Sequence, residues 1–169
     1  CTQKPPTETE AATSGSFCEW GPLGMLPIFK LLGTDYVDLS FSSIDQDGSD
    51  LFTRCNMQFS TASSTFSTGT GIKTENDMIV TGTGGFIYVP APWWKTDYFE
   101  IRHEDLRDTK KVFYQYAGEG MRHGIMEFVR AVNNGLTDIS AHPYDEVLAQ
   151  TAVLESFLQQ KEKPTSRRP

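Results

Sequence analysis

The chain has 169 residues, 38% of them hydrophobic and 12% aromatic, which is enough for one folded domain with a sizeable core. Its net charge of -7, without a cluster of Lys and Arg before the last few residues, argues against nucleic acid as a partner. No apolar run reaches the roughly 18 residues that a membrane span needs, and no signal peptide is recognisable. Three cysteines without metal-ligand spacing favour free thiols in a reducing, cytoplasmic setting.

Both ends of the chain are polar. Residues 1–14 are rich in Thr, Glu and Pro, and we expect a mobile polar arm there. Residues 161–169 are expected to form a polar tail. The predicted ordered body is therefore 15–160.

The first apolar segment is 23–32, which predicts a short, buried helix. Pro22 suits the first turn of such a helix, and Gly33 suits the position just after its end. Pro27 is expected to kink the helix or to delay its start. Residues 15–21 are expected to form an irregular approach to it.

Alternation of apolar and polar residues next predicts half-buried strands at 37–41 and 51–57. The Ser- and Thr-rich segment 60–71 has the composition of a linker. We favour a strand, because Thr suits pleated surfaces and the segment lies between two other strands.

A hairpin is predicted over 78–89, where two short apolar runs flank a glycine-rich turn. These glycines join two strands and open no helix, so they do not form a dinucleotide-binding fingerprint. Trp93 and Trp94 follow the hairpin and could stack on a sugar or cofactor ring, although such aromatics more often anchor packing. Lys95 after them is expected to be solvated.

The remaining segments change from strands to helices. Short strands are predicted at 98–102 and 111–116, followed by a helix over 121–132 with one apolar stripe. A last helix begins at His142-Pro143, and its predicted buried face comprises Val147, Thr151, Leu154 and Leu158. Strands followed by helices indicate an α+β fold with a largely antiparallel sheet.

Taken alone, the residues do not assemble a self-sufficient active site. Glu19 precedes the buried helix and could act as an acid or base, although a carboxylate there more often satisfies backbone amides. The histidines have no ligand spacing, so no metal site is expected: His103, His123 and His142. No G-x-S-x-G motif supports a serine nucleophile.

Three segments together nevertheless resemble one family. They are V-T-G-T-G-G-F-I-Y-V-P at 80–90, P-W-W-K at 92–95 and G-E-G-M-R-H-G-I-M-E-F-V-R-A-V-N-N-G at 118–135. In this order they resemble the C-terminal domain of the glucose–fructose oxidoreductase / inositol dehydrogenase (Gfo/Idh/MocA) family. The resemblance implies an α+β fold with an open, largely antiparallel mixed sheet and helices packed on one face.

The resemblance also implies a role. Such a domain binds a sugar, polyol or related carbonyl substrate and forms a homo-oligomer through its open sheet face. A separate N-terminal Rossmann domain binds NAD or NADP. This chain has no Rossmann fingerprint and, by resemblance, begins after the first strand of the C-terminal domain. We therefore expect the isolated chain to bind no nicotinamide cofactor and to be inactive.

The same resemblance gives candidate site residues. Many members open the buried helix with a pattern like G-G-x-L-x-D-x-G-x-H, which places the aspartate at Glu19 and the histidine at Leu23. Glu19 is thus the candidate catalytic residue. Leucine cannot transfer a proton, so the parent either uses another acid or base or is inactive. Candidate substrate contacts are Trp20, Leu23, Trp93, Trp94, Lys95, Arg122 and His123.

A second hypothesis belongs to another class of protein. The chain could be a stand-alone, non-catalytic interaction domain that dimerises through its exposed sheet face. The hydroxyl-rich segment 60–71 motivates it, because a flat polar strand can pair with another sheet.

Overall fold

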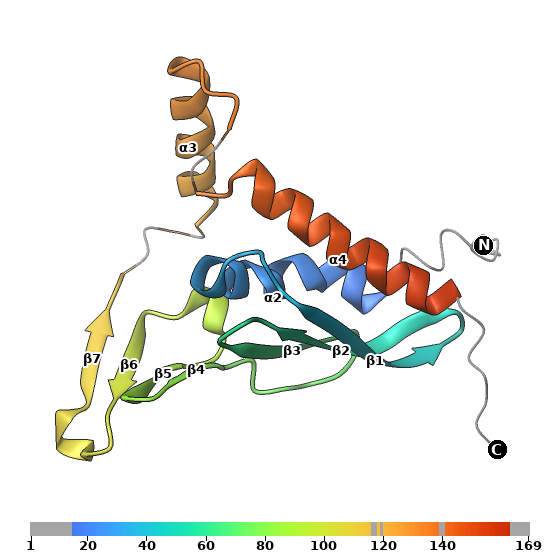
Figure 1. Cartoon of the computed structure of the whole chain (residues 1–169). Helices are drawn as coiled ribbons and strands as arrows, with labels where there is room; N and C mark the ends of the chain where they lie inside the picture. Colours follow the sequence, from blue (N-terminus) through green and yellow to red (C-terminus); the bar gives the residue numbers. More distant parts are fainter. Residues whose placement is uncertain (1–14, 116–117, 119, 139–140, 163–169) are drawn as a thin grey trace. The chain divides into compact units, whose positions relative to one another are not determined.

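The computed structural model describes residues 15–115, 118, 120–138 and 141–162 (Figure 1). The predicted arm at 1–14 and residues 163–169 of the predicted tail lie outside the described residues. The chain divides into two compact units, one of 1–72 with 138–169 and the other of 73–137. Unit 1 and unit 2 are described separately below.

Unit 1 is a three-stranded antiparallel sheet with two helices on one face (Figure 1). The middle strand, β2, pairs with both of the others. Its elements are the helices α2 (Ser16–Leu32) and α4 (Tyr144–Glu162) and the strands β1 (Asp38–Gln46), β2 (Ser49–Gln58) and β3 (Ser63–Gly69). Helix α2 packs on β2 and β3, and α4 packs on α2.

The core of unit 1 is built around aromatic rings from four elements. Phe17 of α2 is fully buried, and its ring centroid lies 5.2 Å from that of Phe41, 5.8 Å from Phe66 and 4.7 Å from Phe157. Met25 and other buried residues of the sheet and helices complete this cluster. One helix face and one sheet face are thereby joined through a continuous apolar layer.

The opposite face of this sheet is mostly polar, and its residues are exposed or half-buried, with the paired Ile44 and Phe52 as apolar residues on it. Asn56 of β2 lies in register between Ser40 of β1 and Thr65 of β3, and the next residues on this face are Arg54 and Ser67. The predicted α+β fold, with an open antiparallel sheet and helices on one face, is confirmed, and so is the predicted strand within 60–71.

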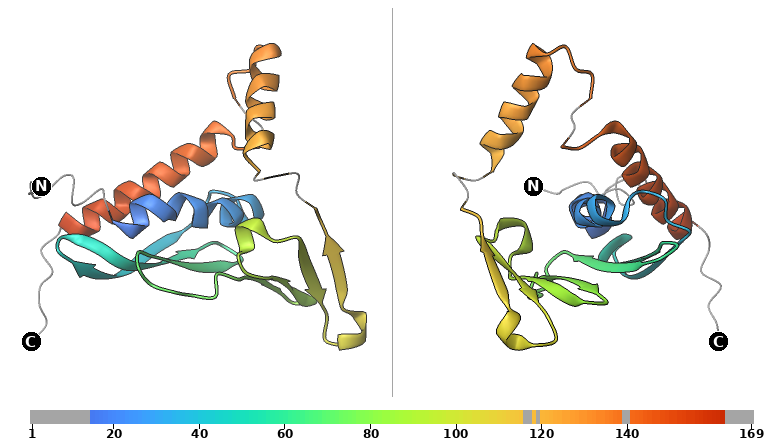
Figure 2. Two further views of the ribbon diagram at one scale, coloured as in Figure 1. Left: turned by 180° about the vertical axis from the view of Figure 1, so that it is seen from behind. Right: turned by 60° about the vertical axis from the view of Figure 1, so that its left-hand side comes forward.

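Unit 2 contains an antiparallel meander of four strands in sequence order (Figure 2). Its elements are β4 (Met78–Gly82), β5 (Gly85–Val89), the 3-10 turn η1 (Trp93–Lys95), β6 (Tyr98–Arg102), the 3-10 turn η2 (Leu106–Asp108), β7 (Lys110–Phe113) and the helix α3 (Met121–Asn133). The predicted hairpin over 78–89 is confirmed. Gly85 at its turn has a φ of +152°, and a Cβ there would lie 2.4 Å from the carbonyl oxygen of Arg102.

The start of α2 differs from the sequence prediction. The helix begins at Ser16 and contains Pro22 and Pro27 in its interior, so the irregular approach predicted for 15–21 is wrong. The prolines suggested a later start because each removes a backbone donor. The first turn forms nevertheless, because Asp50 of β2 accepts a hydrogen bond from the Phe17 amide.

The buried face of α4 also differs from the prediction, by about one position. Of the predicted face, Leu154 and Leu158 are half-buried and pack against the core, whereas Val147 and Thr151 are exposed. The buried residues of α4 are Glu146, Gln150, Val153 and Phe157. Two of these are polar and have partners, since Glu146 bonds Lys30 and Gln150 donates to the Pro22 carbonyl. A search for regularly spaced apolar residues misses such a helix face, because two of its buried residues are polar and hydrogen-bonded.

Helix α3 has the predicted apolar stripe, but the stripe is exposed. Ile125, Phe128 and Val132 are 56%, 60% and 61% exposed. Ala131 is the one buried residue within this helix. The stripe therefore does not contribute to the core of unit 2 in the described part of the chain.

Candidate functional site

The predicted catalytic residue lies on the outward side of α2. Phe17, Met25 and Phe29 hold the other side of this helix in the core of unit 1. Glu19 and Trp20 are both exposed within the first turns, and Trp20 has 47% of its surface open. Both side chains are thus presented from a helix, which fixes side chains more firmly than a loop does.

Leu23 completes the α2 group. It lies one turn after Glu19 on the same side of the helix and is half-buried. A leucine offers an apolar surface and no proton. We call Glu19, Trp20 and Leu23 the α2 edge. It combines one carboxylate, a group that can transfer a proton, with two side chains suited to packing against an apolar part of a ligand.

The other end of α2 is held by an ion pair. The Lys30 ammonium lies 2.7 Å from Oε1 of Glu146, and Nδ1 of His142 lies 3.3 Å from Oε2 of the same carboxylate. The hydrogen bond from Lys30 holds the pKa of Glu146 below its usual value, and His142 contributes in the same direction. This contact links the last turn of α2 to the first turn of α4.

In unit 2, Trp93 and Trp94 form the corner that follows the hairpin. Their ring centroids are 5.8 Å apart and the rings are nearly perpendicular. Trp93 is half-buried and its amide donates to the carbonyl of Asn76, whereas Trp94 is 47% exposed. Lys95 beside them is exposed. One ring thus anchors the corner and the other offers a surface.

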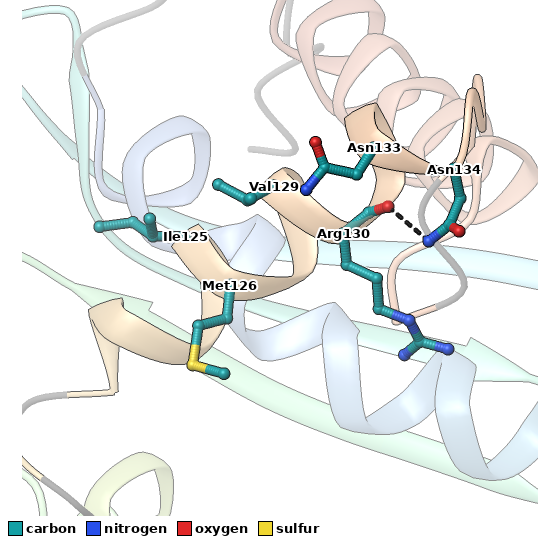
Figure 3. A pocket seen from close by; sticks show the side chains of 6 residues that line it. All are labelled: Ile125, Met126, Val129, Arg130, Asn133 and Asn134. Carbon is teal, nitrogen blue, oxygen red and sulfur yellow. Dashed lines mark hydrogen bonds between the residues drawn. The ribbon is translucent and has the colours of Figure 1, made fainter.

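Arg122 and His123 lie on the first turn of α3, and both are exposed. Farther along the same helix is an open hollow of about 400 Å³ (Figure 3), lined by Ile125, Met126, Val129, Arg130, Asn133 and Asn134. The Asn134 side chain closes the end of this helix by donating to the Arg130 carbonyl at 2.8 Å. The hollow does not include Arg122 or His123.

The predicted site residues thus form three local groups. One lies on α2 in unit 1, and the other two lie at η1 and on α3 in unit 2. Within the described ranges, no three His, Cys, Asp or Glu residues gather as a metal site would require. No helix in the same part of the chain is both long enough and apolar enough to cross a membrane.

The two thiols in the described part of unit 1 are poorly suited to reaction. Cys55 in β2 is fully buried, and burial raises its pKa to about 12. Cys18 in α2 is half-buried, and its pKa is raised by burial first and by the charge of Asp50 second. A thiol held in its protonated form is a weak nucleophile and a weak metal ligand.

Three buried carboxylates in the described part of the chain escaped the sequence analysis, and Glu146 of α4 is one of them. Asp50 is 2% exposed and bonds the start of α2, and Glu100 in β6 is 7% exposed. Glu100 lies 2.9 Å from Lys111 and 2.6 Å from Arg102, and these hydrogen bonds, that from Lys111 foremost, lower its pKa. The Glu100 cluster had a usable signal, because Glu100 and Arg102 lie two residues apart on one predicted strand and Lys111 begins the next. No sequence signal marked Asp50 as buried, because its partners lie 33 or more residues away along the chain or within its own strand.

No protein-family model matches the chain, and no curated protein matches it in sequence. Solved structures do share its fold. A Desulfitobacterium hafniense protein described as an NADPH-dependent oxidoreductase matches 92% of this chain with a TM-score of 0.67 and 17% identity, over 49% of its own length. A Klebsiella pneumoniae protein described as an oxidoreductase matches 88% of this chain with a TM-score of 0.65 and 16% identity, over 47% of its length.

A third structure is a mutant of KijD10, a 3-ketoreductase from Actinomadura kijaniata, in complex with TDP-benzene and NADP. It matches 84% of this chain with a TM-score of 0.64 and 15% identity, over 46% of its own length. The chain therefore spans about half the length of the oxidoreductase structures that it resembles. At these identities the similarity establishes a shared fold.

Proposed function

We propose that this chain is the substrate-binding and oligomerisation domain of an NAD(P)-dependent oxidoreductase, of the Gfo/Idh/MocA type, that acts on a sugar, polyol or related carbonyl compound. The observation that carries the proposal is the fold shared over 92% of this chain with half of a protein described as NADPH-dependent. NAD or NADP is then held by a separate Rossmann domain, and this chain alone binds neither.

In this proposal the α2 edge faces the substrate. Glu19 transfers the proton, because it is the one titratable side chain of the α2 group, while Trp20 and Leu23 pack against the substrate. Trp94 offers a further ring for a sugar face, and the remaining candidate contacts are Trp93, Lys95, Arg122 and His123.

The first test is the reading frame upstream of Cys1. A βαβ unit with a glycine fingerprint is expected there, and its absence would sink the proposal in this form. The full-length protein should then oxidise or reduce members of a polyol and sugar panel with NAD(P). Replacing Glu19 by Gln should lower kcat by about 100-fold or more, the usual contribution of a positioned acid or base.

The matched control is Glu155→Gln, which removes an exposed carboxylate from α4. This control should keep the full rate, because Glu155 lies outside the α2 edge. An unchanged rate in Glu19→Gln would remove Glu19 from the mechanism and leave the fold-based part of the proposal standing.

We propose the open sheet face of unit 1 as the surface for self-association. The face is open and mostly polar across three strands, with Asn56 at its centre, Arg54 beside it and Ile44 exposed on β1. Asn56→Arg should shift the chain towards the monomer in light scattering, whereas Glu155→Arg on the helical side should not. A wild-type chain that is monomeric across micromolar concentrations would contradict this assignment.

The stand-alone interaction domain remains the second candidate function, and it relies on the same polar face. It requires self-association or partner binding in the absence of any oxidoreductase activity. A natural start codon close to residue 1, with no glycine fingerprint upstream, would favour it over the first proposal.

A further inference from the structure

Asp50 is a buried carboxylate at the point where the sheet of unit 1 meets α2. Its Oδ2 accepts three hydrogen bonds, from the Ser16 hydroxyl at 2.6 Å, the Phe17 amide at 2.9 Å and the Thr53 hydroxyl at 2.8 Å. Two of these donors belong to the first two residues of α2. The carboxylate thus caps the helix from a strand more than thirty residues away, where N-terminal amides and the helix dipole favour a negative charge.

The contact continues into all three strands. The Ser16 hydroxyl also lies 3.2 Å from that of Thr68 in β3, and the Thr53 hydroxyl lies 3.0 Å from that of Ser43 in β1. Asp50 and Thr53 themselves belong to β2. The first turn of α2 is therefore hydrogen-bonded, directly or through one hydroxyl, to the whole width of the sheet.

The fit around the carboxylate leaves no room for a side chain at the preceding position. A Cβ on Gly15 would lie 1.8 Å from Oδ1 of Asp50, well inside any permitted contact. The backbone of Gly15 is extended, with a φ of -78°, so this position needs a glycine for space and not for its dihedral angles. Gly15 and Asp50 thus form a closely fitted pair.

We propose that Asp50 is a positioning residue, whose carboxylate fixes the first turn of α2 and thereby the placement of Glu19 and Trp20. What that edge binds rests on the proposed function, but its placement does not. Ser16 and Phe17 contact the Asp50 carboxylate, and Glu19 and Trp20 follow them within the next turn. If the first turn frays, Glu19 and Trp20 therefore change position. Glu19 is itself bonded into this turn, because its amide donates to the Gly15 carbonyl at 3.2 Å.

The test compares Asp50→Ala, Asp50→Asn and Gly15→Ala with the control Asp38→Asn, an exposed carboxylate at the start of β1. Asp50→Asn keeps one acceptor oxygen and should show a partial effect. Gly15→Ala keeps the carboxylate but must displace it. Gly15→Ala therefore tests the same contact between Asp50 and α2 in case Asp50→Ala does not fold.

The first readout is native-state amide hydrogen exchange. Asp50→Ala should raise exchange at 17–20 by about tenfold or more, because hydrogen bonds to a charged group are worth at least that factor. Exchange at 28–32, in the last turn of α2, should change by much less. A purely stabilising role would raise exchange to a similar extent along the whole helix, and that result would overturn the proposal.

The second readout is acrylamide quenching of Trp20 in a chain that carries Trp93→Phe and Trp94→Phe. Loss of the cap should change both the quenching constant and the emission maximum of Trp20 under conditions where the chain is folded. Unchanged values in Asp50→Ala and Gly15→Ala would refute the positioning role. Neither readout involves a substrate or cofactor, so failure of the proposed oxidoreductase function would leave both results interpretable.

Discussion

Replacing Phe17 by Ala is the strongest single test of the core that supports α2. The side chain is fully buried and contacts three other rings, those of Phe41, Phe66 and Phe157. Truncating a buried Phe to Ala costs about 3–5 kcal/mol, from lost burial and from the cavity that remains. The upper part of that range applies here, because partners from three other elements meet at one point and cannot all close the gap.

That loss is large compared with the stability of a small unit. Domains have free energies of unfolding of about 5–15 kcal/mol, and for a unit of this size each kcal/mol shifts Tm by about 4–8 °C. A loss of about 4 kcal/mol should therefore lower the Tm of unit 1 by about 15–30 °C. The variant should therefore unfold at a lower temperature and at a lower urea concentration than the wild-type chain.

Urea unfolding followed by Trp20 fluorescence measures this change, with Trp93 and Trp94 replaced by Phe so that the signal comes from unit 1 alone. The control is Ile44→Thr, which changes a 60% exposed residue of β1 and should alter stability by about 0.5 kcal/mol or less. A loss below about 1 kcal/mol for Phe17→Ala would refute the account of the core, because it lies far outside the range for a packed aromatic cluster.

Three further predictions concern the same unit. Gly24→Ala should destabilise it, because a Cβ there would lie 2.4 Å from the Phe66 ring and overpacking of about 1–3 kcal/mol exceeds the gain in helix propensity. Lys30→Met should lower the urea midpoint at pH 7 by the equivalent of roughly 0.5–1 kcal/mol. Because the folded pKa of Glu146 is lowered, that difference is present above the usual Glu pKa of about 4.3 and disappears as the pH falls through the folded value. Cys55 should resist iodoacetamide at pH 8 until urea unfolds the unit, because it is buried and its pKa is about 12.

The first two of these predictions have control variants, and the third has a result that would contradict it. Gly124→Ala in α3 has open space around the new methyl group and should instead stabilise that helix by about 0.5–1 kcal/mol. Arg54→Met removes an exposed cation that bonds a hydroxyl, so its effect should not depend on acidic pH as that of Lys30→Met does. Labelling of Cys55 in the native state, at the rate of an unfolded chain, would contradict the burial of β2.

The strands could be predicted because their signal is local. Apolar residues at every second position predict a strand with one buried face. The strand predicted at 98–102 coincides with β6. The hairpin at 78–89 was equally accessible, because its turn residues lie between its strands in the sequence. Predicting the strand within 60–71 required a further inference, because its composition alone is that of a linker. Its position between two predicted strands favoured a strand, and β3 lies there.

The helices were harder to predict, because contacts across the fold decide where they begin and which side is buried. The start of α2 depends on Asp50, and the buried side of α4 depends on Glu146 finding Lys30. Neither partner can be recognised at a sequence separation of 33 or 116 residues without knowledge of the fold. Glu19 was a candidate from its position beside the apolar segment and from the family resemblance, but its place inside α2 was not predicted.

The two prolines of α2 explain why both of its ends are fixed from outside. Pro22 and Pro27 each remove one backbone hydrogen bond from the helix interior, so local bonding alone supports this helix poorly. Asp50 compensates at the first turn, and the Lys30–Glu146 ion pair compensates at the last. A helix held at its ends and along one side keeps its free side in place even where its own hydrogen bonds are interrupted. Of these two contacts, the one at Asp50 lies in the same turn as Glu19, so its loss should change the placement of Glu19 before it unfolds the sheet.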